Sequence, residues 1–187
     1  MDLVFLGIQG SGKGTQARRM ADEFGYHVFD MGQALRDMAA SGTELGATVK
    51  SYIEEGNLVP FNIIMDVVRD AIEKHKDENI LFDGIPRDMD QKREFDAVMH
   101  DLKRNFRCIN ILLPIDMAFN RIKGRAEKEG RVDDADDEKV RRRMSLFQEK
   151  TMPVVSQYIK EEKLLQVDGA GSMDDVYDLI KILLLKT

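Results

Sequence analysis

The stretch Leu3-Val4-Phe5-Leu6-Gly7-Ile8-Gln9-Gly10-Ser11-Gly12-Lys13-Gly14-Thr15 decides the fold of this chain. Its first four residues are apolar and typical of a buried strand, and the glycines allow a tight loop before a helix expected from about Gln16. Gly7, Gly12 and Lys13 satisfy the pattern G-x4-G-K, although Gly14 precedes Thr15 where the strict motif has the hydroxyl residue. Backbone N–H groups of such a loop bind phosphate oxygens, and the lysine adds a mobile charge. The stretch therefore predicts a site for the phosphates of a nucleoside triphosphate.

Four further apolar runs, at residues 27–29, 80–82, 109–113 and 164–167, lack polar alternation and are typical of strands covered on both faces. The segments between them have helical periodicity, as in the apolar positions of residues 63–72. In the last helix, Ser172 is expected to be the N-cap, and the apolar stripe is expected to contain Val176, Leu179, Ile180 and Leu183. This alternation predicts a right-handed, doubly wound α/β layer structure.

Two segments depart from this alternation. Residues 30–60 contain two helical patterns and no strand, and residues 123–137 contain Gly124, Gly130 and many charges but few apolar residues. Both are expected to leave the sheet at its carboxyl edge, where open α/β sheets bind ligands. No linker composition divides the chain, so we expect residues 1–187 to form a single domain.

Composition excludes several classes of protein. The chain has 187 residues, of which 43% are hydrophobic and 33% charged, so it is not a disordered sequence. A net charge of −6 argues against a nucleic-acid partner, and no apolar run is long enough to cross a membrane. The single Cys108, expected to be buried, excludes an internal disulfide, and the three histidines, His27, His75 and His100, show no metal-ligand spacing. We expect a cytoplasmic monomer.

A second group of residues suits a second phosphate. Asp83 follows a predicted strand, where it could hold the water shell of a magnesium ion. Arg87 can bind a phosphate with two nitrogens, and Gln91 offers an amide donor and acceptor to the edge of a base. Gly32 and Arg36 are four residues apart at the start of a predicted helix, so they lie on the same side of it.

With these motifs in this order, the chain resembles the adenylate kinase family over nearly its whole length. The resemblance rests on the phosphate loop through Gln16, on Asp83-Gly84-Ile85-Pro86-Arg87 and on Gly130-Arg131-Val132-Asp133-Asp134. It implies a P-loop α/β/α fold with five parallel strands. It also implies a helical insertion at about 30–60 that binds the nucleoside monophosphate (NMP) and a short ATP lid at about 122–134. The implied substrates are ATP with Mg²⁺, and AMP or ADP.

The same resemblance implies a role for each site residue. The ATP phosphates would be held by Gly10, Ser11, Gly12, Lys13, Gly14 and Thr15. Arg121 would stack on the adenine of ATP, Arg125 would contact its phosphates, and Arg131 and Arg143 would close on the transferred group. Asp83 would order the waters of magnesium. The monophosphate site would contain Met31, Gly32, Arg36, Asn57, Leu58, Val59, Gly84, Arg87 and Gln91, with a cis bond between Ile85 and Pro86.

The chemistry of such a site follows from charge. A monophosphate has a second pKa near ~6, so its oxygen nucleophile is already largely ionised at pH 7 and needs no general base. The obstacle is to bring two anions together in line, so catalysis is expected to be positioning and charge neutralisation. The lid must also exclude water, because water would otherwise hydrolyse ATP.

Several departures from the family pattern leave alternatives open. Met31 stands where adenylate kinases usually have threonine, which leaves UMP/CMP kinase as an alternative, whereas Gln91 favours AMP. A nucleotide-gated binding or assembly factor with weak ATPase activity is the alternative from another class. Arg143 is preferred over Arg142 as the second arginine beside the lid, and Arg141 is expected to be solvated. Phe61, where the family usually has aspartate, is interpreted as a packing change. The lid contains no cysteine or histidine, so no zinc is expected there.

Overall fold

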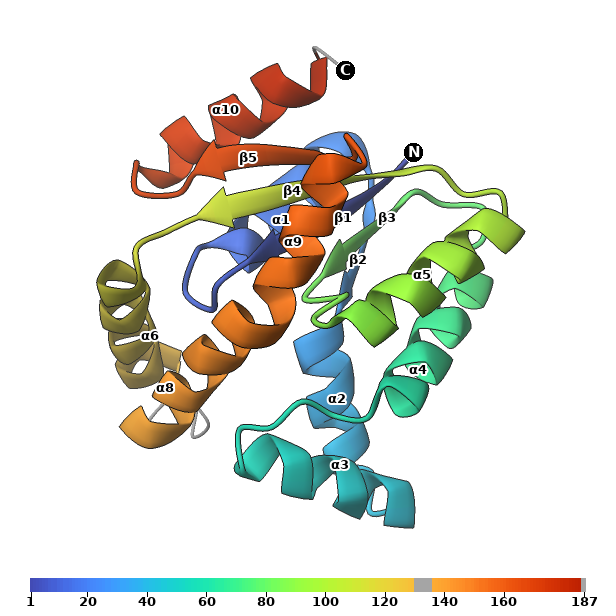
Figure 1. Ribbon diagram of the computed structural model, residues 1–187, viewed down its shortest axis with the longest axis vertical. Helices are drawn as coiled ribbons and strands as arrows, with labels where there is room; N and C mark the ends of the chain where they lie inside the picture. Colours follow the sequence, from blue (N-terminus) through green and yellow to red (C-terminus); the bar gives the residue numbers. More distant parts are fainter. Residues whose placement is uncertain (130–135, 186–187) are drawn as a thin grey trace.

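The protein is described by a computed structural model, which covers residues 1–129 and 136–185, with the side chains of residues 126–129 left out. Its sheet consists of five parallel strands in the order β2-β3-β1-β4-β5 (Figure 1). The strands are β1 (Asp2–Gly7), β2 (His27–Asp30), β3 (Ile80–Asp83), β4 (Phe106–Leu112) and β5 (Leu164–Asp168). The strand order changes direction beside β1, so the loop after β1 lies where α/β sheets bind ligands.

Helices cover both faces of the sheet, because successive side chains of a strand point to opposite sides. Leu3 and Phe5 of β1 pack with α1 (Lys13–Phe24) and α10 (Met173–Leu185). Val4 and Leu6 pack into the larger core on the other face, with α4 (Phe61–Lys74), α5 (Met89–Asp101) and α9 (Met152–Lys160). Edge-to-face aromatic contacts cross this second core; in chain order their members are Phe29, Phe82, Phe95, Phe106 and Tyr158.

Two groups of helices extend beyond the layers. Helices α2 (Met31–Ala39) and α3 (Glu44–Glu54) follow β2, and α6 (Ile115–Glu129) and α8 (Asp137–Leu146) follow β4 (Figure 1). A short π-helical segment η1 (Phe147–Thr151) joins α8 to α9. The helix starts are fixed by side chains: Asp30 caps α2, Thr43 caps α3 and Asp136 caps α8 by accepting backbone N–H groups.

The fold class expected from the sequence is confirmed, with differences in detail. Strand β4 begins three residues before the predicted run, at Phe106, because Asp2 and Phe106 already pair in register. Ser172 forms the expected cap, since its Oγ accepts from the N–H of Asp175 at 3.1 Å. The predicted apolar stripe of the last helix is wrong at one residue. Leu179 is 42% exposed, and Tyr177 is buried instead.

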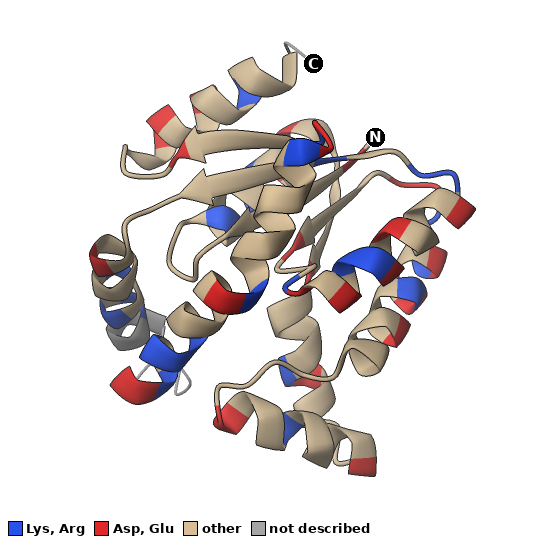
Figure 2. Ribbon diagram, in the orientation of Figure 1, with Lys and Arg blue, Asp and Glu red and all other residues tan. Residues whose placement is uncertain are grey.

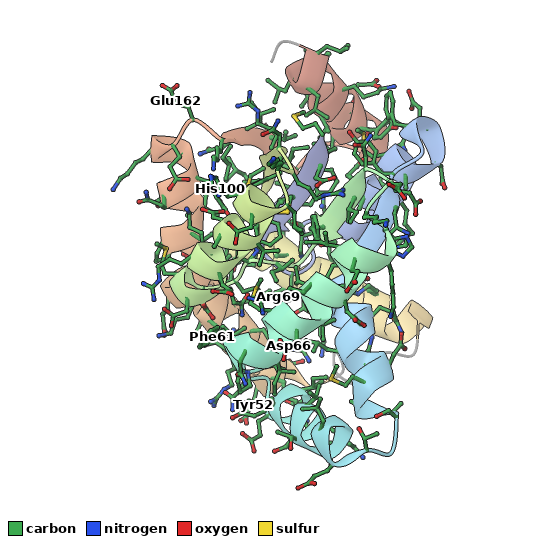
Figure 3. The ribbon with its side chains drawn as sticks, turned by 90° about the vertical axis from the view of Figure 1, so that its right-hand side faces the viewer. Tyr52, Phe61, Asp66, Arg69, His100 and Glu162 are labelled. Atoms are coloured by element: carbon green, nitrogen blue, oxygen red, sulfur yellow. The ribbon has the colours of Figure 1, made fainter. Side chains whose placement is uncertain are left out.

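Of two further expectations, the one for Cys108 is confirmed and the one for Phe61 is not. Cys108 is fully buried as expected, and burial raises the pKa of its thiol well above the ordinary value. The interpretation of Phe61 as a packing change is wrong. Phe61 is the first residue of α4, lies at the surface (Figure 3) and is 47% exposed, while Ile64 and Met65 make the contacts of that turn with the core. Within the described residues no helix has the length and apolarity needed to cross a membrane.

Candidate functional site

A cavity of about 570 Å³ opens at the carboxyl edge of the sheet, where β1, β2 and β3 end. Its walls come from the phosphate loop, α2, the segment after α3, the loop after β3, α6, α8 and the loop after β5. All but one of the candidate site residues line it: Gly10, Ser11, Gly12, Lys13, Gly14, Thr15, Met31, Gly32, Arg36, Asn57, Leu58, Val59, Asp83, Gly84, Arg87, Gln91, Arg121, Arg125 and Arg143. Arg131 lies outside the described residues.

The phosphate loop has a backbone that other residues would not allow. Gly10 has φ +84°, and a Cβ at this position would lie 2.6 Å from the carbonyl oxygen of Ala118. Gly12 has φ +95° and is the N-cap of α1, whose first N–H groups therefore point at the cavity. The loop thus presents backbone donors and the positive end of a helix dipole to an anion.

The negative charge near Lys13 is too small to offset the effect of burial on its ammonium group. It makes no hydrogen bond or ion pair with any residue that the structure describes. Burial lowers its pKa, and the positive charges of Arg87 and Arg125 act in the same direction, against the opposing effect of Asp83. The environment therefore disfavours the charged ammonium in the absence of a ligand, and an anion in the cavity would reverse this.

Arg87 is a second cation of the cavity whose charged form is disfavoured by burial. Its Nε donates to the carbonyl of Gly84 at 2.6 Å, which aims the guanidinium, and a side chain at Gly84 would clash with it. Burial lowers the pKa of Arg87, and the neighbouring charges of Arg143 and Arg36 add to this effect. Five of the predicted phosphate ligands thus bring positive charge to one open space: Lys13, Arg36, Arg87, Arg125 and Arg143.

Asp83 provides the acidic side of the cavity. It is 8% exposed, burial raises the pKa of its carboxyl, and its Oδ1 is buried without a hydrogen-bond partner within residues 1–129 and 136–185. Gly14 leaves room for this carboxylate, because a Cβ there would lie 3.0 Å from Oδ2. An unsatisfied carboxylate oxygen beside a phosphate site fits the water shell of a magnesium ion.

The sequence reasoning missed a second carboxylate in the cavity. Asp30 ends β2 as Asp83 ends β3, and the two residues pair in register. Its Oδ1 accepts from the N–H of Gln33 at 2.9 Å, and its charge raises the pKa of Asp83 further. The signal was present, because Asp30 follows an apolar run in the same way as Asp83.

The three consecutive arginines of α8 have three different environments. Arg143 lines the cavity and lies close enough to Arg87 to influence its pKa. Arg142 donates from Nε and Nη2 to Asn57 Oδ1, at 2.9 and 2.5 Å, and so ties α8 to the segment after α3. Arg141 is exposed, as expected, and its guanidinium also lies over the ring of Phe119, 4.7 Å from the centroid. Figure 2 shows the basic segments of α6 and α8 close together.

The two ends of the cavity differ in polarity. Near the phosphate loop, Arg121 donates to the carbonyl of Gly169 at 3.1 Å. At the other end, apolar side chains of α2, α3, α4 and the segment after α3 form the wall: Met31, Leu35, Ile53, Leu58, Val59 and Ile64. Gln91 enters this end with only half of its amide, because its Oε1 already accepts from the N–H of Arg87 at 2.8 Å.

A cavity with a cationic end and an apolar end, at the carboxyl edge of a parallel sheet and beside a phosphate loop, is typical of α/β proteins that transfer phosphoryl groups between nucleotides. Comparison with known proteins agrees: the family model "Adenylate kinase" matches residues 5–163. The chain is 39% identical over 180 residues to the adenylate kinase of Thermus thermophilus, covering 96% of this chain and 94% of that one. It is 36% identical over 184 residues to that of Deinococcus deserti (95% and 93% covered) and 30% identical over 179 residues to that of Bacteroides thetaiotaomicron (95% and 94%).

The chain therefore belongs to the adenylate kinase family. It is an ATP-binding phosphotransferase of the nucleoside monophosphate kinase class.

Proposed function

We propose that this enzyme catalyses MgATP + AMP ⇌ 2 ADP, and that the cationic cavity at the carboxyl edge of the sheet is its active site. The observation that carries the proposal is the gathering of Lys13, Arg36, Arg87, Arg125 and Arg143 around one space, with lowered pKa values at Lys13 and Arg87. Cations placed together at this electrostatic cost need an anionic ligand, and two nucleotides bring several phosphate groups.

The reaction needs no proton acceptor from the protein. An oxygen of the AMP phosphate attacks the γ-phosphorus of ATP, and the bond from that phosphorus to the β–γ bridging oxygen breaks, leaving ADP. Arg87 and Arg36 would hold the attacking phosphate, and Lys13 and Arg125 would neutralise charge on the ATP phosphates. Arg143, on α8, would contact both the attacking phosphate and the transferred phosphoryl group. Bringing the two anions into line is the main contribution of these side chains.

Asp83, with Asp30 beside it, would hold magnesium through water. When bound with ATP, the ion would neutralise charge on the phosphates of the nucleotide. The buried Oδ1 of Asp83, which has no hydrogen-bond partner in the described part of the chain, supports this assignment. Residues 30–60, which include α2 and α3, are proposed as the monophosphate-binding part and residues 122–134 as the lid.

The acceptor is proposed to be AMP because the far end of the cavity suits a purine. Met31 and Val59 line this end and form an apolar wall against which the face of a base can pack, and Gln91 supplies the preference for adenine. The Oε1 of Gln91 already accepts a hydrogen bond, so its Nε2 is the atom that can donate to a ring nitrogen of the base. Met31 in place of threonine is the observation that favours UMP or CMP instead.

ADP formation from MgATP with AMP, UMP, CMP and GMP offered separately tests the proposal, alongside a mixture without acceptor. The expected result is strong turnover with AMP and no ADP in the mixture without acceptor. Preference for UMP or CMP would contradict the acceptor assignment. ADP formation independent of any acceptor would contradict transfer itself and favour a weak ATPase. Monomeric state and cytoplasmic location remain predictions, the former measurable by light scattering.

A further inference from the structure

Three side chains with metal-binding groups meet at the amino edge of the sheet. His27 begins β2, His75 is the C-cap residue of α4, and Glu78 lies in the turn before β3. One ligand atom from each lies within 4.8 Å of the other two, which no other such group does among the described residues. His27 and His75 are far apart in the sequence, so the spacing of the histidines gave no indication of a metal site.

We propose that His27, His75 and Glu78 form a binding site for a zinc-type divalent cation, separate from the active site and from the lid. Two imidazoles and a carboxylate are the ligand set that zinc takes with a water molecule in its fourth position. Magnesium prefers an all-oxygen set, so the same residues discriminate against the ion that accompanies ATP. Asp30, at the opposite end of β2, lines the cavity, so the strand separates the two sites.

The backbone holds the three positions in place. The N–H of His27 donates to the carbonyl of Asn79 at 2.9 Å, and His27 pairs in register with Ile80 of β3. The N–H of His75 donates to Ala71, and the N–H of Glu78 donates to His75, each at 3.1 Å. An ion at this site would join the start of β2 to the connection between α4 and β3, so binding would stabilise the fold.

The ion-free arrangement also shows what must move. The rings of His27 and His75 are stacked with centroids 3.3 Å apart and planes at 14°, and His75 Nδ1 is 2.7 Å from Glu78 Oε1. A metal lies in the plane of each ligating imidazole, so two nearly parallel rings cannot both bind one ion. Binding therefore requires one ring to turn. The His75 side chain is 29% exposed and that of Glu78 53% exposed, so both have room to move and a water can complete the coordination.

Titration of the full-length protein with ZnCl₂ alone, after treatment with a chelator and without nucleotide, tests the site. We expect one zinc per chain and a rise in melting temperature of about 5–10 °C at a zinc concentration a hundred times the dissociation constant. His27→Gln and His75→Gln should each remove both effects, and Glu78→Gln, which replaces the third ligand, should weaken binding and reduce the rise in melting temperature. Mg²⁺ in place of Zn²⁺ should give neither.

The matched control is His100→Gln. His100 lies on α5 (Figure 3), its side chain is 90% exposed, and it takes no part in the cluster, so this variant should bind zinc as the wild type does. Loss of the ring stacking on binding would appear as changed imidazole shifts of His27 and His75 by NMR. The proposal is wrong if the wild type binds no zinc, or if His27→Gln and His75→Gln, shown to be folded by circular dichroism, bind it unchanged. It does not depend on which monophosphate the enzyme phosphorylates.

Discussion

Two regions of this molecule hold positive charge away from bulk water, and they do so in opposite ways. In the cavity, burial lowers the pKa of both Lys13 and Arg87, and neighbouring cations add to the effect. Between α5 and α9, Lys92 is 5% exposed, yet hydrogen bonds to Asp96 and Glu161, at 2.6 and 2.9 Å, outweigh the effect of burial and raise its pKa.

At the amino edge of the sheet, as around Lys92, a cation is paired with a carboxylate of the protein. Arg104 binds the buried carboxylate of Asp2 with two nitrogens, each at 2.7 Å, and also donates to the carbonyls of Lys76 and Glu78. These hydrogen bonds to Asp2 raise the pKa of Arg104. Lys92 and Arg104 are thus paired with carboxylates of the protein, whereas Lys13 in the cavity makes no such pair within residues 1–129 and 136–185. The pKa is lowered at Lys13 and Arg87 and raised at Lys92 and Arg104, which separates these four residues into two kinds.

The largest expected effect is on the cavity side. Lys13→Met should lower ADP formation from MgATP and AMP by roughly 10³-fold or more, because the ATP phosphates lose their mobile charge. Circular dichroism should show an unchanged fold. Turnover within a few fold of the wild type in a folded variant would mean that Lys13 is not a phosphate ligand.

The three consecutive arginines of α8 allow a cation of the cavity to be compared with two cations outside it in the same helix turn. Arg143→Gln should reduce turnover by roughly 10²-fold or more, because this guanidinium lies in the cavity. Arg142→Gln should have a smaller effect, through the lost contact with Asn57, and Arg141→Gln should have none on turnover. Steady-state assays of the three matched variants check this order. An equal loss in all three would mean that general positive charge on α8, rather than the placement of Arg143, is what matters.

For Lys92, which is paired with two carboxylates, we expect an effect on stability and none on turnover. Lys92→Met should leave turnover unchanged but lower the free energy of unfolding by about 1.5–3 kcal/mol, because Asp96 and Glu161 lose their counter-charge. For a chain of this size, this corresponds to a drop in melting temperature of about 4–10 °C. Lys160→Met, on the exposed face of α9, is the matched control and should melt as the wild type does. A stable Lys92→Met protein would show that the network contributes little.

The smallest effect concerns the contact between α1 and α10. The Tyr177 hydroxyl donates to Glu23 at 2.7 Å, and burial, with this hydrogen bond, raises the pKa of Tyr177 to about 12. A raised phenol pKa stabilises the folded state below pH 10, and this contribution is lost as the pH rises from 10 to 12. Chemical unfolding of Tyr177→Phe should therefore show a weaker fall in stability over that range. Identical pH dependence in the two proteins would contradict this.

The sequence was a good guide to the fold and to the composition of the cavity. Apolar runs fix the strands, and the loops after parallel strands meet at one edge, so motif residues as distant as Lys13 and Arg87 could be expected to converge. The choice of Arg143 over Arg142 came from the spacing of motifs, and it agrees with the cavity wall.

Pairings that depend on three-dimensional packing could not be predicted in this way. Nothing near His27 in the sequence indicates that His75 stacks against it. The charges of Lys92 and Asp96 suggest an ordinary solvated helix face until α9 covers them. In α10, Tyr177 is buried in place of Leu179 because its hydroxyl reaches Glu23, a partner that helical periodicity cannot identify.

The most direct test of the account is the melting temperature of Lys13→Met without nucleotide, measured beside that of the wild type. If Lys13 is held for phosphate at the cost of its own burial, removing its charge removes an electrostatic cost. The variant should then melt at or above the wild-type temperature, and MgATP should stabilise it far less than it stabilises the wild type. A nucleotide-free Lys13→Met protein that melts several degrees lower, as expected for Lys92→Met, would contradict the account.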